Sequence, residues 1–173
     1  MSLRLPIAAK ILLLALAYVV AGRLSLLLAI PPGFASAIFP PIGIALAAVL
    51  IWGNPLLLGV FLGSTLLNLS IGYSATGQLN LPGLWVALGI ALGTSLQCFC
   101  ATWLIRRWVH FPNPLIDEKS IFLLLLLGGP LTCLLSASVG ASVLLMAGII
   151  DPSQFPFSWW TWWVGDSIGV LLA

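Results

Sequence analysis

Long uninterrupted apolar runs, such as ILLLALAYVV (residues 11–20) and IFLLLLLGG (residues 121–129), limit this chain to very few folds. A helix needs about 20 mainly apolar residues to span a hydrocarbon core. The chain is 61% hydrophobic and 6% charged, whereas soluble domains carry about 25% charged residues. The runs do not alternate apolar and polar residues, as membrane β-strands do. We therefore predict an all-α, polytopic transmembrane helical bundle.

The apolar runs predict about six membrane elements. A first helix is expected from Leu5 to Leu28, a third from Pro55 to Ile71, a fourth from Pro82 to Arg106, a fifth from Ser120 to Ala147, and a sixth from about Phe157 off the end of the chain. Pro55 and Pro82 suit the first turn of a helix, where the missing N–H would have no intrahelical partner.

The second element, residues 30–53, is interrupted by two Pro-Pro pairs. Its unbroken part after Pro41 is only about ten residues, or about 15 Å of helix. Proline removes a backbone donor and clashes with the preceding turn, so the first half is expected to be irregular. Irregular backbone at membrane depth must be buried in protein or line a cavity. An otherwise ordinary, proline-kinked helix is the alternative.

Lysine and arginine in the short loops predict the orientation, because cytoplasmic loops carry an excess of both. Arg4 and Lys10 precede the first helix, and Arg106, Arg107 and Lys119 flank the loop between the fourth and fifth helices. Residues 71–83 and 149–158 contain no lysine or arginine. We therefore predict a cytoplasmic N-terminus, with these two loops outside.

Charged and irregular groups are expected to share one layer in the outer half of the membrane. At about 1.5 Å per residue, Arg23 and Asp166 fall roughly 8 and 14 Å below the outer surface. Charges at such depth usually face a partner or a cavity. Two interpretations stay open: Arg23 and Asp166 pair or bound one polar pocket, or Arg23 snorkels to the headgroups while Asp166 caps a kink near Gly165.

Four tryptophans, Trp159, Trp160, Trp162 and Trp163, open the sixth helix and are typical of an aromatic belt. Three- and four-residue spacing also places some of these rings on the face of Asp166, where one or two could roof the polar layer. The candidate sensing residues are Arg23, Pro40, Pro41, Asn68, Ser142, Trp162, Trp163 and Asp166.

Three GxxxG spacings indicate close helix packing, since small residues let helix backbones approach. They are Gly59 with Gly63, Gly89 with Gly93, and Gly165 with Gly169. A homodimer interface is a second use of such surfaces.

No pattern in the sequence indicates catalysis or a bound cofactor. There is no Ser/His/Asp set and no phosphate-binding glycine loop. Cys98, Cys100 and Cys133 lie in apolar runs without metal-site spacing, and the net charge of +2 is too small to argue for nucleic acid. We predict a non-catalytic chain with no metal and no cofactor.

Three segments together resemble the first type of the MASE family, the membrane-associated sensor domains of bacteria. They are PPxGIALA (residues 40–47), GxFLGSxLxN (residues 59–68) and WWxGDxxG (residues 162–169). The resemblance covers nearly the whole chain. It implies a single integral membrane sensory domain over residues 1–173, multi-pass in the bacterial inner (plasma) membrane, that serves a cytoplasmic histidine kinase, GGDEF cyclase or EAL phosphodiesterase.

Such domains usually have about eight helices and a downstream output domain, so we expect a C-terminally incomplete fragment, or else a short form that needs a partner chain. The expected partners are the lipid bilayer, an output domain and an unknown small-molecule or physical cue. The alternative function is a small substrate-binding membrane component of a transporter, because broken helices beside buried polar groups also build transport sites.

Overall fold

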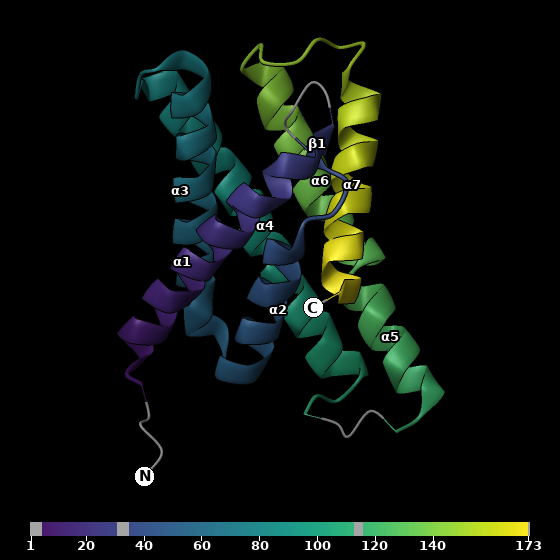
Figure 1. The fold of residues 1–173 in the computed structure, drawn as a ribbon. Coiled ribbons are helices and arrows are strands. Elements are labelled where there is room, and N and C mark those ends of the chain that lie inside the picture. The colour runs from purple at the N-terminus through teal and green to yellow at the C-terminus, as the bar shows by residue number, and fades with distance from the viewer. Residues whose placement is uncertain (1–4, 31–34, 113–115, 173) are drawn as a thin grey trace.

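Helices make up nearly all of the computed structural model, which describes residues 5–30, 35–112 and 116–172 (Figure 1). Within these ranges the helices are α1 (Ile7–Ser25), α2 (Pro40–Trp52), α3 (Leu57–Thr76), α4 (Leu81–Trp108), α5 (Glu118–Gly128), α6 (Pro130–Met146) and α7 (Phe155–Leu172). Single 3-10 turns follow α1 (Leu26–Leu28) and precede α3 (Asn54–Leu56). Arg4 and the first Pro-Pro pair, Pro31 and Pro32, lie outside the described residues.

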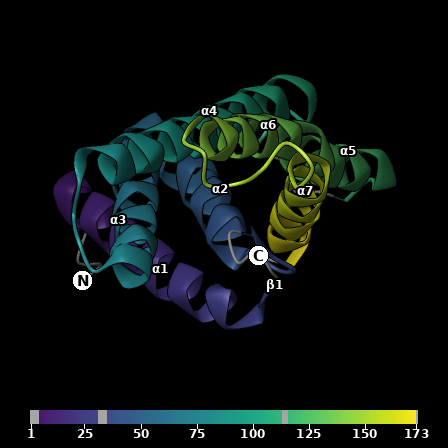
Figure 2. The same ribbon diagram turned by 90° about the horizontal axis from the view of Figure 1, so that it is seen from above.

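The helices surround α2, the shortest but one. Seen from above, α1 and α3 lie on one side, α7 on the other, and α4 and α6 along one edge, with α2 between them (Figure 2). Residues of α2 contact α1, α4 and α7. Its buried residues Ile42, Ala45 and Val49 belong to the main hydrophobic core. A helix that is apolar all round suits this central position.

The all-α membrane class is confirmed. Four helical segments are long and apolar enough to cross a membrane, namely Ile7–Leu28, Asn54–Thr76, Leu81–Trp108 and, taken together, Glu118–Met146. The outward faces of these helices carry large apolar side chains, such as Leu16, Leu66 and Leu92. Hydrocarbon is a suitable surrounding for these faces, because every backbone group of a helix is satisfied internally.

The second element is broken by proline, as predicted. Two short strands, β1 (Ala29–Ile30) and β2 (Ala35–Ser36), pair antiparallel before α2 begins. Pro40 and Pro41 occupy the first turn of α2, where a missing N–H costs no hydrogen bond. The chain is therefore extended before α2, which is different from a kinked but continuous helix.

The predicted fifth helix, Ser120 to Ala147, is two helices in the structure. Pro130 begins α6 directly after Gly129, whose φ of −99° and ψ of −105° depart from helical geometry. Proline has no N–H to continue the helical ladder. Thr132 offsets the break, because its hydroxyl lies 2.9 Å from the Leu127 carbonyl and 3.1 Å from the Gly128 carbonyl.

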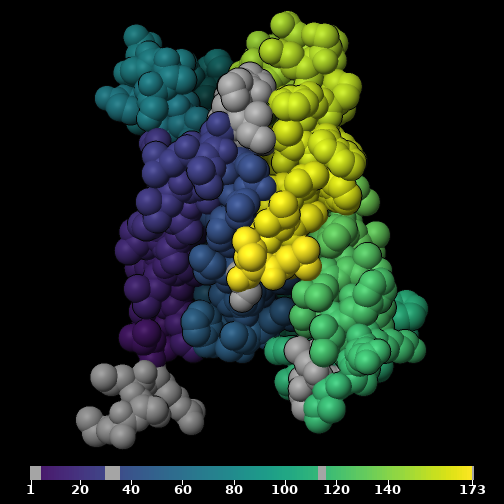
Figure 3. Space-filling view, turned by 45° about the vertical axis from the view of Figure 1, so that its right-hand side comes forward, coloured from purple at the N-terminus to yellow at the C-terminus, as the bar shows by residue number. Residues whose placement is uncertain are grey.

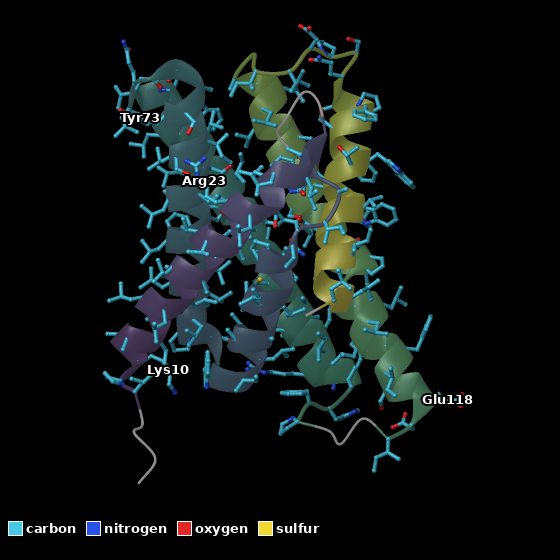
Figure 4. All side chains as sticks on the ribbon, in the orientation of Figure 1. Lys10, Arg23, Tyr73 and Glu118 are labelled. Atoms are coloured by element: carbon cyan, nitrogen blue, oxygen red, sulfur yellow. The ribbon has the colours of Figure 1, made fainter. Side chains whose placement is uncertain are left out.

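Basic residues cluster at one end of the bundle. Lys10 and Glu118 lie at the end opposite Tyr73 (Figure 4). At the Lys10 end, Arg106 of α4 donates hydrogen bonds to the Asn54 side chain at 3.0 Å and to the Val49 carbonyl at the end of α2 at 3.2 Å. A cation is favourable at a helix C-terminus. That the Lys10 end faces the cytoplasm stays a prediction from charge.

The GxxxG glycines lie at contacts between elements of the same chain. A methyl group added to Gly63 of α3 would lie 2.8 Å from the Tyr18 side chain of α1. One added to Gly93 of α4 would lie 2.8 Å from Val139 of α6. These two surfaces are therefore occupied within the chain, by α1 and α6.

Helix α7 packs on the opposite side of the bundle from α3. In Figure 3 its side chains (yellow) lie against those of α2 (blue) and of α5 and α6 (green). Glycine makes this approach close, since methyl groups added at Gly165 and Gly169 would collide with the backbone carbonyls of Ser36 and Phe39. Helix α7 thus lies directly on the chain that leads from β2 into α2.

Candidate functional site

Asp166 is the centre of the candidate site, and α7 carries it into the interior. Only 3% of its surface is exposed. The Ser136 hydroxyl of α6 donates a hydrogen bond to Asp166 Oδ2 at 2.5 Å. Trp162 lies one turn earlier on α7, at the four-residue spacing that places it on the same helix face as Asp166. The hydrogen bond from Ser136 of α6 therefore holds the carboxylate of α7 in place.

The connection between β2 and α2 lies next to Asp166 because of the glycine beside it. The Phe39 amide donates a hydrogen bond to the Gly165 carbonyl at 3.0 Å. Ser36 lies within the same connection, and its hydroxyl is 2.7 Å from the Ser25 carbonyl at the end of α1. The broken second element is thus tied to α7 on one side and to α1 on the other.

A cavity of about 40 Å³ adjoins Asp166. One water needs roughly 10–15 Å³ of such volume, so the cavity has room for about three. Its polar lining comes from Tyr18, Ser36, Ser64, Asn68, Thr94, Trp162 and Asp166, and its apolar lining from Leu26, Phe39, Leu67, Ile71 and Ile90. The site is therefore assembled from α1, α3, α4, α7 and the segment around β2.

Hydroxyl groups form the wall on the α1, α3 and α4 side. Tyr18 of α1 is 2% exposed, and it lines the cavity together with Ser64 on α3 and Thr94 on α4. The Thr94 hydroxyl also donates to the Ile90 carbonyl at 3.1 Å. These side chains can both donate and accept hydrogen bonds, so the wall can accommodate water or a polar ligand.

A line of polar groups continues from Asp166 toward α4. The Ser136 hydroxyl lies 3.2 Å from the Cys133 carbonyl, and the Gln97 amide donates to the Cys133 sulfur at 3.0 Å. Gln97 Oε1 is buried without a hydrogen-bond partner among the described residues. The carboxylate is therefore one member of a polar network inside the bundle.

Arg23 lies elsewhere, and the structure does not show the pair with Asp166. Its guanidinium is exposed and donates to the Ser70 carbonyl at 2.9 Å and the Ser74 hydroxyl at 3.3 Å, both on α3. Arg23 and Asp166 were predicted at similar depth, but their side chains are not on facing sides of α1 and α7. Of the two interpretations, the structure favours an exposed Arg23 that is separate from Asp166.

The Asp166 carboxylate has no basic neighbour in the described part of the chain. No lysine, arginine or histidine lines the cavity, and the groups that act on Asp166 are Ser136 and Trp162. Burying one charged group without an opposite charge costs several kcal/mol in lost hydration. The site therefore favours a proton, a bound cation or water beside this carboxylate.

Three of the predicted sensing residues come together at the cavity, namely Asn68, Trp162 and Asp166. Pro40 and Pro41 begin α2 one residue after Phe39, which lines the cavity. They shape the site through the backbone.

Besides Arg23, two predicted residues lie away from the cavity. Trp163 turns to the α5–α6 break, where its indole donates to the Pro130 carbonyl at 2.7 Å, and it stacks on Trp159 with ring centres 6.3 Å apart. Ser142 is half-buried on α6 and does not belong to the lining.

Five polar residues of the site were not predicted from the sequence, namely Tyr18, Ser36, Ser64, Thr94 and Ser136. Serine and threonine in membrane helices often bond to their own backbone, so their presence carries little information. Tyr18 offered a signal, because it is the one residue with a hydroxyl in the run ILLLALAYVV.

The fold and the site define a helical membrane domain with a carboxylate cavity inside the bundle. The family model MASE1 matches residues 10–173. The chain therefore belongs to the MASE1 family, whose domains are membrane sensory domains found in signalling proteins. Comparison with curated proteins and with solved structures gave no match.

Proposed function

We propose that this chain is the membrane input domain of a bacterial signalling protein, multi-pass in the inner membrane, and that its Asp166 cavity registers the cue. The output domain, a histidine kinase or a cyclic-di-GMP enzyme in the same or a partner chain, lies in the cytoplasm. Membership of the MASE1 family supports the sensory role.

One observation carries the proposal: a single carboxylate borders a cavity whose walls come from four helices and the β2 segment. Protonation, water entry or ligand binding at Asp166 changes the local charge by up to a full unit. In a low-dielectric interior such a change is felt strongly by neighbouring dipoles. The packing of all these elements therefore depends on the state of one side chain.

Helix α7 offers a route for this change to reach the rest of the bundle. It contacts both broken elements, through the hydrogen bonds of Phe39 to Gly165 and of Trp163 to Pro130. Helix α2 ends beside Arg106, at the end where Lys10 lies. A shift of α7 would thus move α2 and α6 through contiguous packing, by which coupling between sites is carried.

The test measures the basal output of the intact signalling protein in membranes, for Asp166→Asn and the matched control Asp151→Asn. Asp151 lies exposed in the connection before α7. Asparagine keeps a carbonyl acceptor for Ser136 and removes the charge. At equal membrane levels, Asp166→Asn should change output by about fivefold or more, the lower range of allosteric coupling, and the control should not. Wild-type output from Asp166→Asn would contradict the proposal.

A substrate-binding component of a transporter is a second candidate, because α2 and α6 both begin at proline beside α7. Broken helices at a central site are characteristic of transporters. Under this alternative, Asp166→Asn would reduce uptake of a solute by cells and leave every signalling output unchanged.

A further inference from the structure

A second, larger cavity opens at the Tyr73 end of the bundle, between the end of α3, the start of α4 and the end of α6. Its volume is about 280 Å³. The walls include Val86, Leu144 and Ile149, and polar residues such as Gln78 and Asn80 line its α3–α4 side. We call this cavity the vestibule. A cavity of about 150 Å³ lined by apolar residues already holds benzene, so the vestibule can hold an aromatic ring or a short alkyl chain.

The vestibule and the Asp166 cavity share a wall. Asn68, Ile71, Ile90 and Trp162 line both. A molecule in the vestibule is therefore separated from Asp166 only by these side chains. Trp162 belongs to α7 and is half-buried, and its ring packs against Gly140 of α6, so the position of this ring sets part of the wall between the two cavities.

Charge selects the class of molecule that would fit both cavities. Asp166 is the one carboxylic acid among the described residues that line either cavity, and no lysine, arginine or histidine is among them. An anion would be repelled, whereas a cation would offset the buried carboxylate. An indole face such as that of Trp162 also attracts ammonium groups.

Size and polarity narrow the class further. The two volumes, about 40 and 280 Å³, together reach only the lower end of small-molecule sites, which begin at about 300 Å³. A sugar would leave hydroxyl groups against the apolar walls. A lipid would exceed the space, so an ammonium group on a short apolar body is the best match.

We propose that the vestibule and the Asp166 cavity form one binding site for a small organic ammonium ion, with the ammonium group beside Asp166 and the apolar body in the vestibule. This inference rests on the proposed function, since it names the chemical class of cue that the Asp166 cavity registers.

Binding to the purified chain in lipid nanodiscs tests this assignment, with empty nanodiscs as the blank. The probes are 2-phenylethylammonium and the uncharged 2-phenylethanol, which share one apolar body. We expect saturable binding of the ammonium ion, at least about tenfold tighter than that of the alcohol. A tenfold difference is about 1.4 kcal/mol, a modest attraction between one cation and one carboxylate. Equal affinity for the two probes would overturn the role of the charge. This comparison uses the wild-type chain alone.

Two further measurements complete the test. In the n-alkylammonium series from methyl to butyl, affinity should rise about fourfold per methylene while the vestibule fills; a flat series would overturn the role of the vestibule. Asp166→Asn should weaken 2-phenylethylammonium by about tenfold or more, and Asp151→Asn should not. If the ion fails to bind while Asp166→Asn still changes signalling output, this inference fails and the proposed function stands.

Discussion

Arg23 and Asp166, two charged residues predicted at similar depth, occupy opposite environments. Arg23 lies exposed at the rim between α1 and α3 and bonds to Ser70 and Ser74. Asp166 is buried, has no opposite charge among the described residues, and borders a cavity. The arginine can therefore reach water or headgroups on its own, whereas the state of the aspartate depends on what enters the protein. A sensor is better built around the second kind of residue.

Helix α7, which carries Asp166, is tightly packed against the connection from β2 to α2. Of the changes considered, Gly169→Ala on this helix should lower the unfolding free energy most. The added methyl group would collide with the Phe39 backbone, which cannot move aside as a side chain can. We expect a loss of about 3 kcal/mol in unfolding free energy, the upper range for overpacking. Unfolding of the purified chain in detergent measures it.

Gly72→Ala on α3 is the matched control, because a methyl group there meets no atom within 4 Å. Alanine in a helix should be neutral or stabilising by up to about 1 kcal/mol. If both variants unfold like the wild type, the close contact of α7 with the β2–α2 connection is contradicted.

Gly140→Ala tests whether the position of Trp162 is set by α6. The added methyl group would lie 2.5 Å from the Trp162 ring, so the ring must shift. We expect this shift to lower the unfolding free energy by about 1–3 kcal/mol. Trp162→Phe removes the colliding atoms, and the two changes should couple by about 1 kcal/mol in a double-mutant cycle of unfolding free energies.

The control for this cycle is Gly59→Ala, whose added methyl group would contact α1 and not Trp162. It should add to Trp162→Phe within about 0.5 kcal/mol. Additivity of Gly140→Ala as well would mean that α6 does not hold the ring.

Arg23→Gln should have a smaller effect, below about 1 kcal/mol, because exposed polar contacts contribute little. Added salt should change the stability of the wild type and of this variant alike. A loss well above this limit, or a dependence on the residue at position 166, would show that the arginine acts on the buried site after all.

Asp117 is an exposed carboxylate that can be compared with Asp166. Protonation of Asp117 should affect only the first turn of α5. Hydrogen bonds from Ser120, including one from its amide at 2.8 Å, lower the pKa of Asp117 from 3.8. A lowered folded pKa means that the cap is fully effective above pH 3.8 and is lost as the pH falls through the folded value. The protection factor of the Ile121 amide in the first turn of α5, the exchange rate of a free amide at the same pH divided by its own, should fall in that acid window.

Asp117→Asn is the control, since asparagine also caps a helix and does not titrate. Exchange at Ile121 should then be free of this acid-dependent step. The same step in the variant would exclude the Asp117 cap as its cause.

The sequence predicted the helical spans well, because hydropathy reports the length of a helix in hydrocarbon. The second Pro-Pro pair likewise predicted an irregular segment before α2, whose regular part was expected after Pro41 and begins at Pro40. The break at Gly129 was missed because the apolar run continues across it. Proline there begins a new helix, and Thr132 compensates for the lost bonds, so composition alone shows nothing unusual.

The site was only partly predictable for a geometric reason. Spacing along a helix gives depth, but it does not give the direction in which a helix faces its neighbours. Asp166 was identified because a carboxylate is rare in such a run, yet its partner Ser136 was not. The separation of Arg23 from Asp166 depends on the rotation of α1 and α7, which the glycine contacts set.

The most direct measurement of the central claim is a double-mutant cycle on signalling output, with Asp166→Asn, Arg23→Gln and both changes in the intact protein at equal membrane levels. If Asp166 acts through its own cavity, Asp166→Asn should change output by about fivefold or more, Arg23→Gln should match the wild type, and the double variant should match Asp166→Asn. Return of the double variant to wild-type output, or an effect of Arg23→Gln as large as that of Asp166→Asn, would contradict the account.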